Sequence, residues 1–224
     1  MEPLEIRITQ DFICPWCWIG EKKLEEALAL EGASEHVTYV FMPYELNPDM
    51  PPEGRDRKAY RTAKFGSWAR SQAMDAHVTQ EGRLHGLTFD YDLVKRTPNT
   101  LAAHRLVWFV QSEGGDARAL VDAIFRAYFT QGSDIGNADV LVDIAASVGL
   151  DRGRVSDLLA SQEGYAQVRK LEAAGALESV NVVPTIKLGS EIVSGAQPVP
   201  VFRRALRLAS NVANRAVGTE AAAS

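Results

Sequence analysis

The only two cysteines of this 224-residue chain stand three positions apart, as Cys14 and Cys17 in the segment DFICPWCWIGEKK. A helical pattern begins at Pro15, which suits a first helical turn because its missing N–H removes no intrahelical bond. The positive end of a helix favours a thiolate, and a cysteine pKa of about 8.5 falls to roughly 3.5–7.5 at such sites. We therefore expect a redox-active dithiol in which Cys14 attacks a disulfide and Cys17, one turn deeper, resolves the mixed disulfide.

The cysteine pair could instead belong to a zinc site, or the two thiols could be buried and inert. Structural zinc takes four ligands, and the chain has no second pair of cysteines at this spacing. A strand that leads directly into CPWC and then into a helix is the context that a redox site requires. The sequence thus favours chemistry over structure for this pair. The histidines show no spacing typical of metal ligands: His36, His77, His85 and His104.

The second feature of interest is the segment VVPT, far along the chain at residues 182–185. A proline at the start of a strand cannot donate to the ladder, so it lies at an edge or a strand entrance. An ordinary trans proline would be the usual interpretation of this segment. Together with the upstream CPWC, however, it suggests a cis bond between Val183 and Pro184, which would make a tight bend.

Strand patterns occur at both ends of the chain. Apolar and polar residues alternate in LEIRITQDF and again in HVTYVFMPYEL, on either side of the helix that begins at Pro15, which predicts a parallel βαβ unit. Near the C-terminus, TIKL and EIVSG flank the turn dipeptide Gly189-Ser190, which predicts a hairpin. Pro198 then opens a last helix.

Residues 49–178, between these strand regions, have the pattern of an almost wholly helical block. Its segments begin with Thr-Pro, acidic, Asn or Ser residues and several end in glycine. The order β-α-β, helices, β-β-α predicts an α/β protein, a thioredoxin fold with a large all-helical insertion. Residues 1–48 and 179–214 would form the thioredoxin-like domain, 49–178 the inserted helical domain, and 215–224 a disordered tail.

Composition narrows the choice of partners and compartment. The chain has 24 basic and 29 acidic side chains, a net charge of −5, and no dense basic run, which argues against a nucleic-acid partner.

The N-terminal segment lacks the features of a signal peptide, and no apolar run reaches the length of a membrane span. We expect a cytoplasmic protein without a membrane partner. The oligomeric state is left open, with a homodimer as one option.

Several segments resemble the DsbA-like thioredoxin superfamily, and within it the FrnE-like branch. They run in family order: DFICPWCWIG, ELNPDMPPEG, NTLAAHRL, IFRAYFTQGSDIGN, VVPT and SGAQP. The resemblance implies a thioredoxin fold with a helical insertion and an active-site CxxC. It also implies a cis-proline loop, carried here by Val183 and Pro184, whose backbone pairs with an extended substrate segment.

The chain departs from its relatives at two positions. Strongly oxidising members carry a histidine where this chain has Trp16, so we expect Cys14 to be a milder oxidant here. Thioredoxin-type proteins often carry a buried carboxylate six residues before the first cysteine, a position that is Ile8 in this chain. Asp11 or a water molecule is then left as the proton acceptor. The extra C-terminal cysteine pair of some FrnE-like members is absent.

Further substrate contacts are suggested by the resemblance of NTLAAHRL to a segment that covers the dithiol groove in relatives. It makes Asn99 and His104 candidate substrate-binding residues, although Asn99 could instead cap a helix and His104 could pack in a polar groove. Trp16 is expected to lie beside the thiols as an apolar contact surface, together with Pro15.

Two functions of different classes follow from these features. The first is a thiol–disulfide oxidoreductase acting on protein or small-molecule thiols and disulfides. It needs no cofactor beyond its own redox-active disulfide, with glutathione binding left open. The alternative is a glutathione-dependent enzyme like the kappa-class transferases or 2-hydroxychromene-2-carboxylate isomerases, which resemble the chain in architecture but carry a serine at the position of Cys14. The intact pair of Cys14 and Cys17 favours the oxidoreductase. A non-catalytic binding module is a third option.

Overall fold

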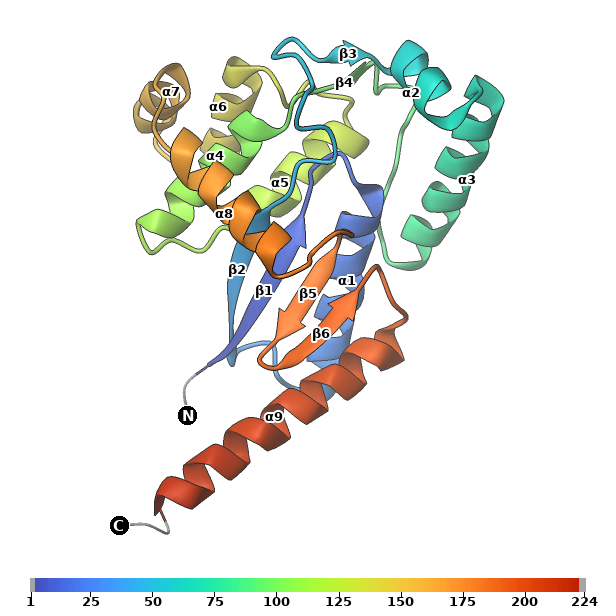
Figure 1. Ribbon diagram of the computed structural model, residues 1–224. Helices are drawn as coiled ribbons and strands as arrows, with labels where there is room; N and C mark the ends of the chain where they lie inside the picture. The colour runs from blue at the N-terminus through green and yellow to red at the C-terminus, as the bar shows by residue number, and fades with distance from the viewer. Residues whose placement is uncertain (1–2, 222–224) are drawn as a thin grey trace.

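A four-stranded mixed sheet forms the centre of the molecule in the computed structural model, which describes residues 3–221 and the side chains up to residue 210. β1 (Leu4–Gln10) pairs in parallel with β2 (Val37–Pro43) and antiparallel with β5 (Thr185–Leu188). β6 (Glu191–Ser194) pairs antiparallel with β5, so the strand order is β2-β1-β5-β6 (Figure 1). This is the sheet of a thioredoxin fold, as the sequence predicts.

The alternation in the first strand corresponds to a buried sheet face. Ile6 and Ile8 of β1 lie in register with Leu188 and Ile186 of β5, and all four side chains are fully buried. Gly189 adopts a positive φ of 59° in the turn between β5 and β6. The predicted hairpin is therefore confirmed.

Helix α1 (Pro15–Glu31) connects β1 to β2 and packs against α9 (Val199–Ala221), which follows β6. The left-handed Gly32 ends α1, and its backbone N–H satisfies helix carbonyls. α9 is helical to Ala221, so it continues beyond the predicted end of the folded chain at residue 214. Residues 222–224 of the predicted tail lie outside what the structure describes.

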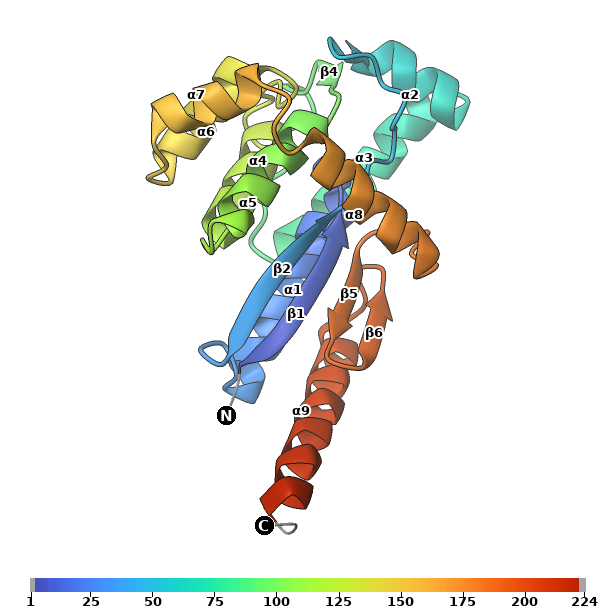
Figure 2. The same cartoon turned by 60° about the vertical axis from the view of Figure 1, so that its left-hand side comes forward.

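The segment between β2 and β5 holds the inserted helices. They gather beyond the carboxyl ends of β1 and β2, where the cysteine segment also lies (Figures 1 and 2). α4 and α8 also contact β2. The helices are α2 (Arg57–Phe65), α3 (Trp68–Leu84), α4 (Leu101–Ser112), α5 (Arg118–Phe129), α6 (Ala138–Ser147), α7 (Arg152–Ala160) and α8 (Tyr165–Leu177).

The insertion differs from the predicted all-helical block in one respect. β3 (Arg55–Asp56) and β4 (Arg96–Thr97) form a short antiparallel ladder that joins the start of the insertion to the segment before α4. Each of these strands has two residues, which is too few to produce a periodic pattern in the sequence. The ladder therefore depends on tertiary pairing between segments about forty residues apart in the chain. The ladder contacts α2, which packs on α3, and α3 in turn lies against α1 (Figure 2).

An aromatic cluster joins the insertion to the sheet region in one continuous core. Trp18 of α1 stacks on Phe125 and Phe129 of α5, with ring centroids 6.0 and 6.2 Å apart. Phe12, just after β1, lies 5.2 Å from Phe125. All four rings are at most 2% exposed. Because these rings come from both parts of the chain, the packing fixes the insertion over the start of α1.

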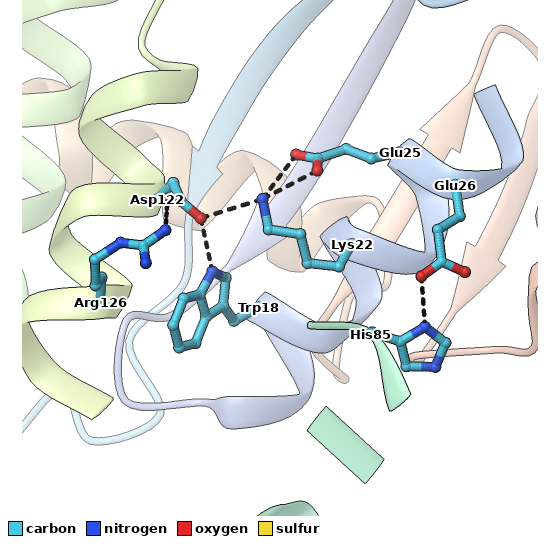
Figure 3. Close-up of polar contacts among 7 residues, drawn as sticks. All are labelled: Trp18, Lys22, Glu25, Glu26, His85, Asp122 and Arg126. Atoms are coloured by element: carbon cyan, nitrogen blue, oxygen red, sulfur yellow. Dashed lines mark hydrogen bonds and ion pairs between the residues drawn. The ribbon is translucent and has the colours of Figure 1, made fainter. Parts of the chain in front are cut away.

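Polar contacts reinforce this attachment on the surface of α1 (Figure 3). The indole N–H of Trp18 donates to Asp122 of α5 at 2.9 Å, and Lys22 lies 3.2 Å from the same carboxylate. Farther along α1, Glu26 contacts His85, at the end of α3, at 2.7 Å. The helix that carries both cysteines is thus connected to both the α5 side and the α3 side of the insertion.

Candidate functional site: a dithiol at a helix start

Cys14 occupies the N-cap position of α1, with extended backbone angles (φ −94°, ψ 105°). The turn from β1 is closed by the N–H of Cys14, which donates to the carbonyl of Asp11 at 3.0 Å. Pro15 is the first helical residue, as predicted, and the N–H of Cys17 donates to the Cys14 carbonyl at 3.0 Å. Strand, tight turn and helix start therefore place the two cysteines on the first turn of α1.

The two sulfur atoms have different surroundings. Both cysteines are free thiols, and Cys14 is 7% exposed whereas Cys17 is completely buried. Burial raises the pKa of Cys17 well above its ordinary value, and hydrogen bonding to Cys14 raises it further. Cys17 therefore keeps its proton, and Cys14 is the sulfur that an incoming molecule can reach.

The loop before β5 lies against the thiols, 169 residues away in the sequence. The peptide bond between Val183 and Pro184 is cis. The Cys14 sulfur is 3.8 Å from the Val183 carbonyl oxygen. Close approach of this loop depends on Gly20 of α1, because a Cβ atom there would lie only 2.9 Å from the Pro184 ring. The two motifs singled out in the sequence thus meet at one place.

Buried ionisable groups lie behind the dithiol. Asp11 is fully buried, accepts a hydrogen bond from the Leu46 N–H at 2.7 Å, and lies 3.5 Å from Nε2 of His104. Glu45, next in the chain to Leu46, contacts Arg169 of α8. Burial raises the pKa of Glu45 to about 7, and the neighbouring Glu172 adds to the effect. We call Asp11, Glu45 and His104 the buried polar cluster.

Three polar atoms of this cluster have no hydrogen-bond partner in the part of the chain that the structure describes. They are Oδ1 of Asp11, Oε1 of Glu45 and Nε2 of His104. Burying a polar group without a partner costs about 1–3 kcal/mol, so such atoms are rare in a region that serves packing alone. Asp11 is also the carboxylate that the sequence suggested in place of the missing one at Ile8.

A pocket of about 180 Å³ opens beside Cys14, between the start of α1 and helices α2 and α3. Trp16 forms one wall, half-buried, with its ring 5.6 Å from that of His77. This placement agrees with the expected apolar surface beside the thiols. Residues that contribute polar or charged groups to the lining are Asn47, Tyr60, Arg61, Lys64, Asp75, Thr97 and Tyr128.

Of the predicted substrate-binding residues, Pro15 and Trp16 line this pocket, Val183 and Pro184 lie on the loop beside Cys14, and Asn99 and His104 do neither. The Asn99 side chain donates to the Met50 carbonyl at 2.7 Å and accepts from the Leu101 N–H at 2.9 Å, so it holds the start of α4. His104 is 4% exposed and faces Asp11. For both residues the structure agrees with the alternative interpretation, capping and packing.

The basic residues in and beside the pocket were not identified from the sequence. Arg57, Arg61 and Lys64 stand at i, i+4 and i+7, a spacing that places side chains on one face of a helix. The spacing was visible in the sequence, but nothing there indicated that this face of α2 turns toward Cys14. That orientation depends on how the insertion packs.

Comparison with known proteins agrees with this fold. The chain belongs to the DSBA-like thioredoxin domain family, whose model matches residues 5–207. A probable DsbA oxidoreductase from Streptomyces coelicolor is 30% identical, with a TM-score of 0.84 over 93% of this chain and 90% of that one. An uncharacterized Bacillus subtilis protein, YwbO, is 25% identical over 91% of this chain and 96% of its own length.

A more distant structure shares the fold. The cytosolic disulfide reductase DsbM from Pseudomonas aeruginosa, solved with glutathione, is 17% identical with a TM-score of 0.63, covering 92% of this chain and 98% of that one. Within the described residues, every helix is too short or too polar to cross a membrane.

Proposed function

We propose that the protein is a thiol–disulfide oxidoreductase in which Cys14 is the nucleophile and Cys17 the resolving thiol. The observation that carries this proposal is the asymmetry of the pair: Cys14 is accessible beside a pocket, whereas Cys17 is completely buried with a raised pKa. Membership of the DSBA-like family supports it, since DsbA-like oxidoreductases act on thiols and disulfides. Within this family the FrnE-like branch is the one that we assign.

The reaction proceeds in two exchanges. The Cys14 thiolate attacks one sulfur of a disulfide, forms a mixed disulfide, and releases the other sulfur as a thiolate. Cys17 then loses its proton and attacks the Cys14 sulfur, which releases the second substrate thiol and leaves the Cys14–Cys17 disulfide. One substrate disulfide is reduced to two thiols while the protein dithiol is oxidised, and the reverse sequence oxidises a substrate.

The Val183 carbonyl, 3.8 Å from the Cys14 sulfur, marks where a substrate backbone would lie. An extended segment pairing with the Val183 loop would bring its own sulfur alongside Cys14. The direction of catalysis depends on the reduction potential against that of the compartment, and each 30 mV corresponds to about 1.4 kcal/mol. A redox titration of the Cys14–Cys17 couple gives this value. A cytoplasmic location remains a prediction.

The test uses two single substitutions. Cys17→Ser is expected to accumulate mixed disulfides through Cys14, seen as adducts in non-reducing mass spectrometry, because the resolving step is missing. Cys14→Ser is expected to form none, because Cys17 is buried. Full disulfide-exchange activity in both variants would show that the assigned mechanism is wrong.

An assay of the same Cys17→Ser protein distinguishes the oxidoreductase assignment from that of a glutathione-dependent transferase or isomerase. Those enzymes need no thiol at position 17, so turnover of a small-molecule acceptor with glutathione would persist in the variant. The oxidoreductase assignment predicts that catalytic turnover is lost and that only stoichiometric adducts form.

A further inference from the structure

The pocket beside Cys14 contains more positive than negative charge. Among the described side chains that line it, Asp75 of α3 is the one carboxylate. Both oxygens of Asp75 are already used by cations: Arg57 donates to one at 2.7 Å and Arg61 to the other at 2.8 Å. Two guanidinium groups therefore share a single carboxylate.

Lys64 adds a third cation. Its ammonium group contacts the side-chain oxygen of Asn47 at 3.0 Å and the hydroxyl of Tyr60 at 2.9 Å, both uncharged. In the described part of the chain, no carboxylate lies within 4 Å of this ammonium group. Among the residues that line the pocket, Arg61 and Lys64 are cations and Asp75 is the one anion, which leaves a surplus of one positive charge, and Arg57 holds Asp75 from behind the lining. Lys64 is exposed, so an anion can reach it.

Arg61 is partly buried, so the surplus positive charge around it is unfavourable. Desolvation lowers the pKa of Arg61, and the charge of Arg57 lowers it further, although Asp75 opposes both. An anion in the pocket would relieve this repulsion.

Most of the remaining lining is apolar, with Thr97 and Tyr128 as the polar exceptions, and the space is small. Trp16, Phe65, Met74 and Val78 form the other walls, with Cys14 at one end. The volume of about 180 Å³ lies below the ~300–1,000 Å³ that is typical of sites for drug-sized ligands. A short thiol arm fits this space.

We infer that the pocket selects low-molecular-weight disulfides whose arms carry a carboxylate, and that Lys64 binds that carboxylate. This inference rests on the proposed function and names its substrate class. When the Cys14 thiolate attacks such a disulfide, one arm leaves as a free thiolate. The other arm stays in the pocket as the mixed disulfide, with its carboxylate on Lys64, until Cys17 attacks the Cys14 sulfur and releases it as the second thiol.

The experiment compares three symmetrical disulfides of similar size. They are 3,3′-dithiodipropionate, which is anionic, 2-hydroxyethyl disulfide, which is neutral, and cystamine, which is cationic. The full-length reduced protein reacts with each under single-turnover conditions, and the rate is followed by tryptophan fluorescence. Each rate is divided by that of the same disulfide with free dithiothreitol. All three disulfides meet the same thiolate, so any change in Cys14 reactivity cancels in the ratio of anionic to neutral rates.

We expect a normalised ratio of about 3 to 5 in the wild-type protein, the range for one partly exposed ion pair. Lys64→Gln should lower it to about 1, and Lys64→Glu should reverse the preference toward cystamine. The matched control is Lys58→Gln on the same helix, because Lys58 is exposed and does not line the pocket. Raising the salt concentration should reduce the wild-type ratio.

Each result decides the inference. A ratio near 1 in the wild-type protein, or an unchanged ratio in Lys64→Gln, overturns it while leaving the proposed function in place. An equal loss in Lys58→Gln also overturns it, because the effect would then come from general surface charge. Reaction with none of the three disulfides would refute the proposed function itself, and the inference with it.

Discussion

The two sides of the dithiol differ in almost every physical respect, although only two residues separate the cysteines. On the Cys14 side there is an accessible pocket with surplus positive charge, built from α2 and α3 of the insertion. The Cys17 side is closed, and Asp11 of the buried polar cluster lies beside it. An open, cationic side favours the approach of an anionic substrate, whereas a closed side keeps outside molecules away from the second thiol.

This difference shows how one chain can assign two roles to identical side chains. The intrinsic chemistry of Cys14 and Cys17 is the same, so their roles come from burial and neighbouring charge. Within one turn of helix, the exposure falls from 7% for Cys14, at the edge of a pocket, to zero for Cys17. The following predictions test that division, from the largest expected effect to the smallest.

The largest expected effect is on alkylation of the reduced protein. Cys14 should react with iodoacetamide at least about a hundredfold faster than Cys17, because the completely buried Cys17 reacts only after local opening. Peptide mass spectrometry after a short pulse measures both rates. Unfolding in urea provides the control, since the two thiols should then react alike. Equal alkylation rates of Cys14 and Cys17 in the native protein would show that the two thiols do not differ in accessibility.

The closed side should make stability depend on pH. Because the pKa of Glu45 is raised to about 7 in the folded protein, folding favours its protonated form. The stability that protonated Glu45 gives the folded protein is fully present below the pKa of this group in the unfolded chain, near 4.3. It is lost as the pH rises through 7, the pKa in the folded protein. The loss amounts to about 1–3 kcal/mol. Urea unfolding at pH 5 and pH 8 measures it.

The matched variant is Glu45→Gln, which keeps the shape of the side chain and removes its titration. Its free energy of unfolding should fall less between pH 5 and pH 8 than that of the wild-type protein. The same fall in both proteins would mean that Glu45 does not produce the pH dependence.

The contact between α1 and the Val183-Pro184 loop should be sensitive to a larger side chain at Gly20. A Cβ there would lie 2.9 Å from the Pro184 ring, so Gly20→Val forces the loop away from Cys14. Overpacking of this kind typically costs 1–3 kcal/mol, and we expect about 2 kcal/mol in urea unfolding together with slower exchange at Cys14. Gly175→Val on α8 is a control for helix propensity, because a Cβ there meets nothing within 4 Å. Equal effects of both substitutions would contradict the close packing.

The smallest effect concerns the oxidising strength of the open side. Trp16→His places a cation-capable side chain beside Cys14, which stabilises the thiolate and therefore the reduced protein. The reduction potential should rise by about 30 mV, or about 1.4 kcal/mol. Equilibration with a thiol–disulfide buffer of known potential measures it. Trp16→Phe removes the indole without adding charge, and a similar rise in that variant would show that packing is responsible.

Much of the fold could be predicted because its signals are local. Alternation in LEIRITQDF, a proline at a helix start and a Gly-Ser turn each depend on a few neighbouring residues, and β1, α1 and the β5–β6 hairpin follow from them. The β3–β4 ladder could not be predicted in this way. Its strands have two residues each, and only pairing between distant segments produces them.

The site shows the same division. The sequence by itself predicted the residues that we propose carry the chemistry: the paired thiols, the helix start at Pro15, and the Pro184 segment as their partner. Tertiary structure alone decided that Cys17 is completely buried, that Asn99 and His104 lie away from the pocket, and that Lys64 lines the same pocket as Cys14. The physical reason is that the burial of a side chain and the net charge around it depend on all the residues that surround it in space. For the pocket beside Cys14, many of those neighbours come from helices α2, α3 and α5, which are remote in the sequence.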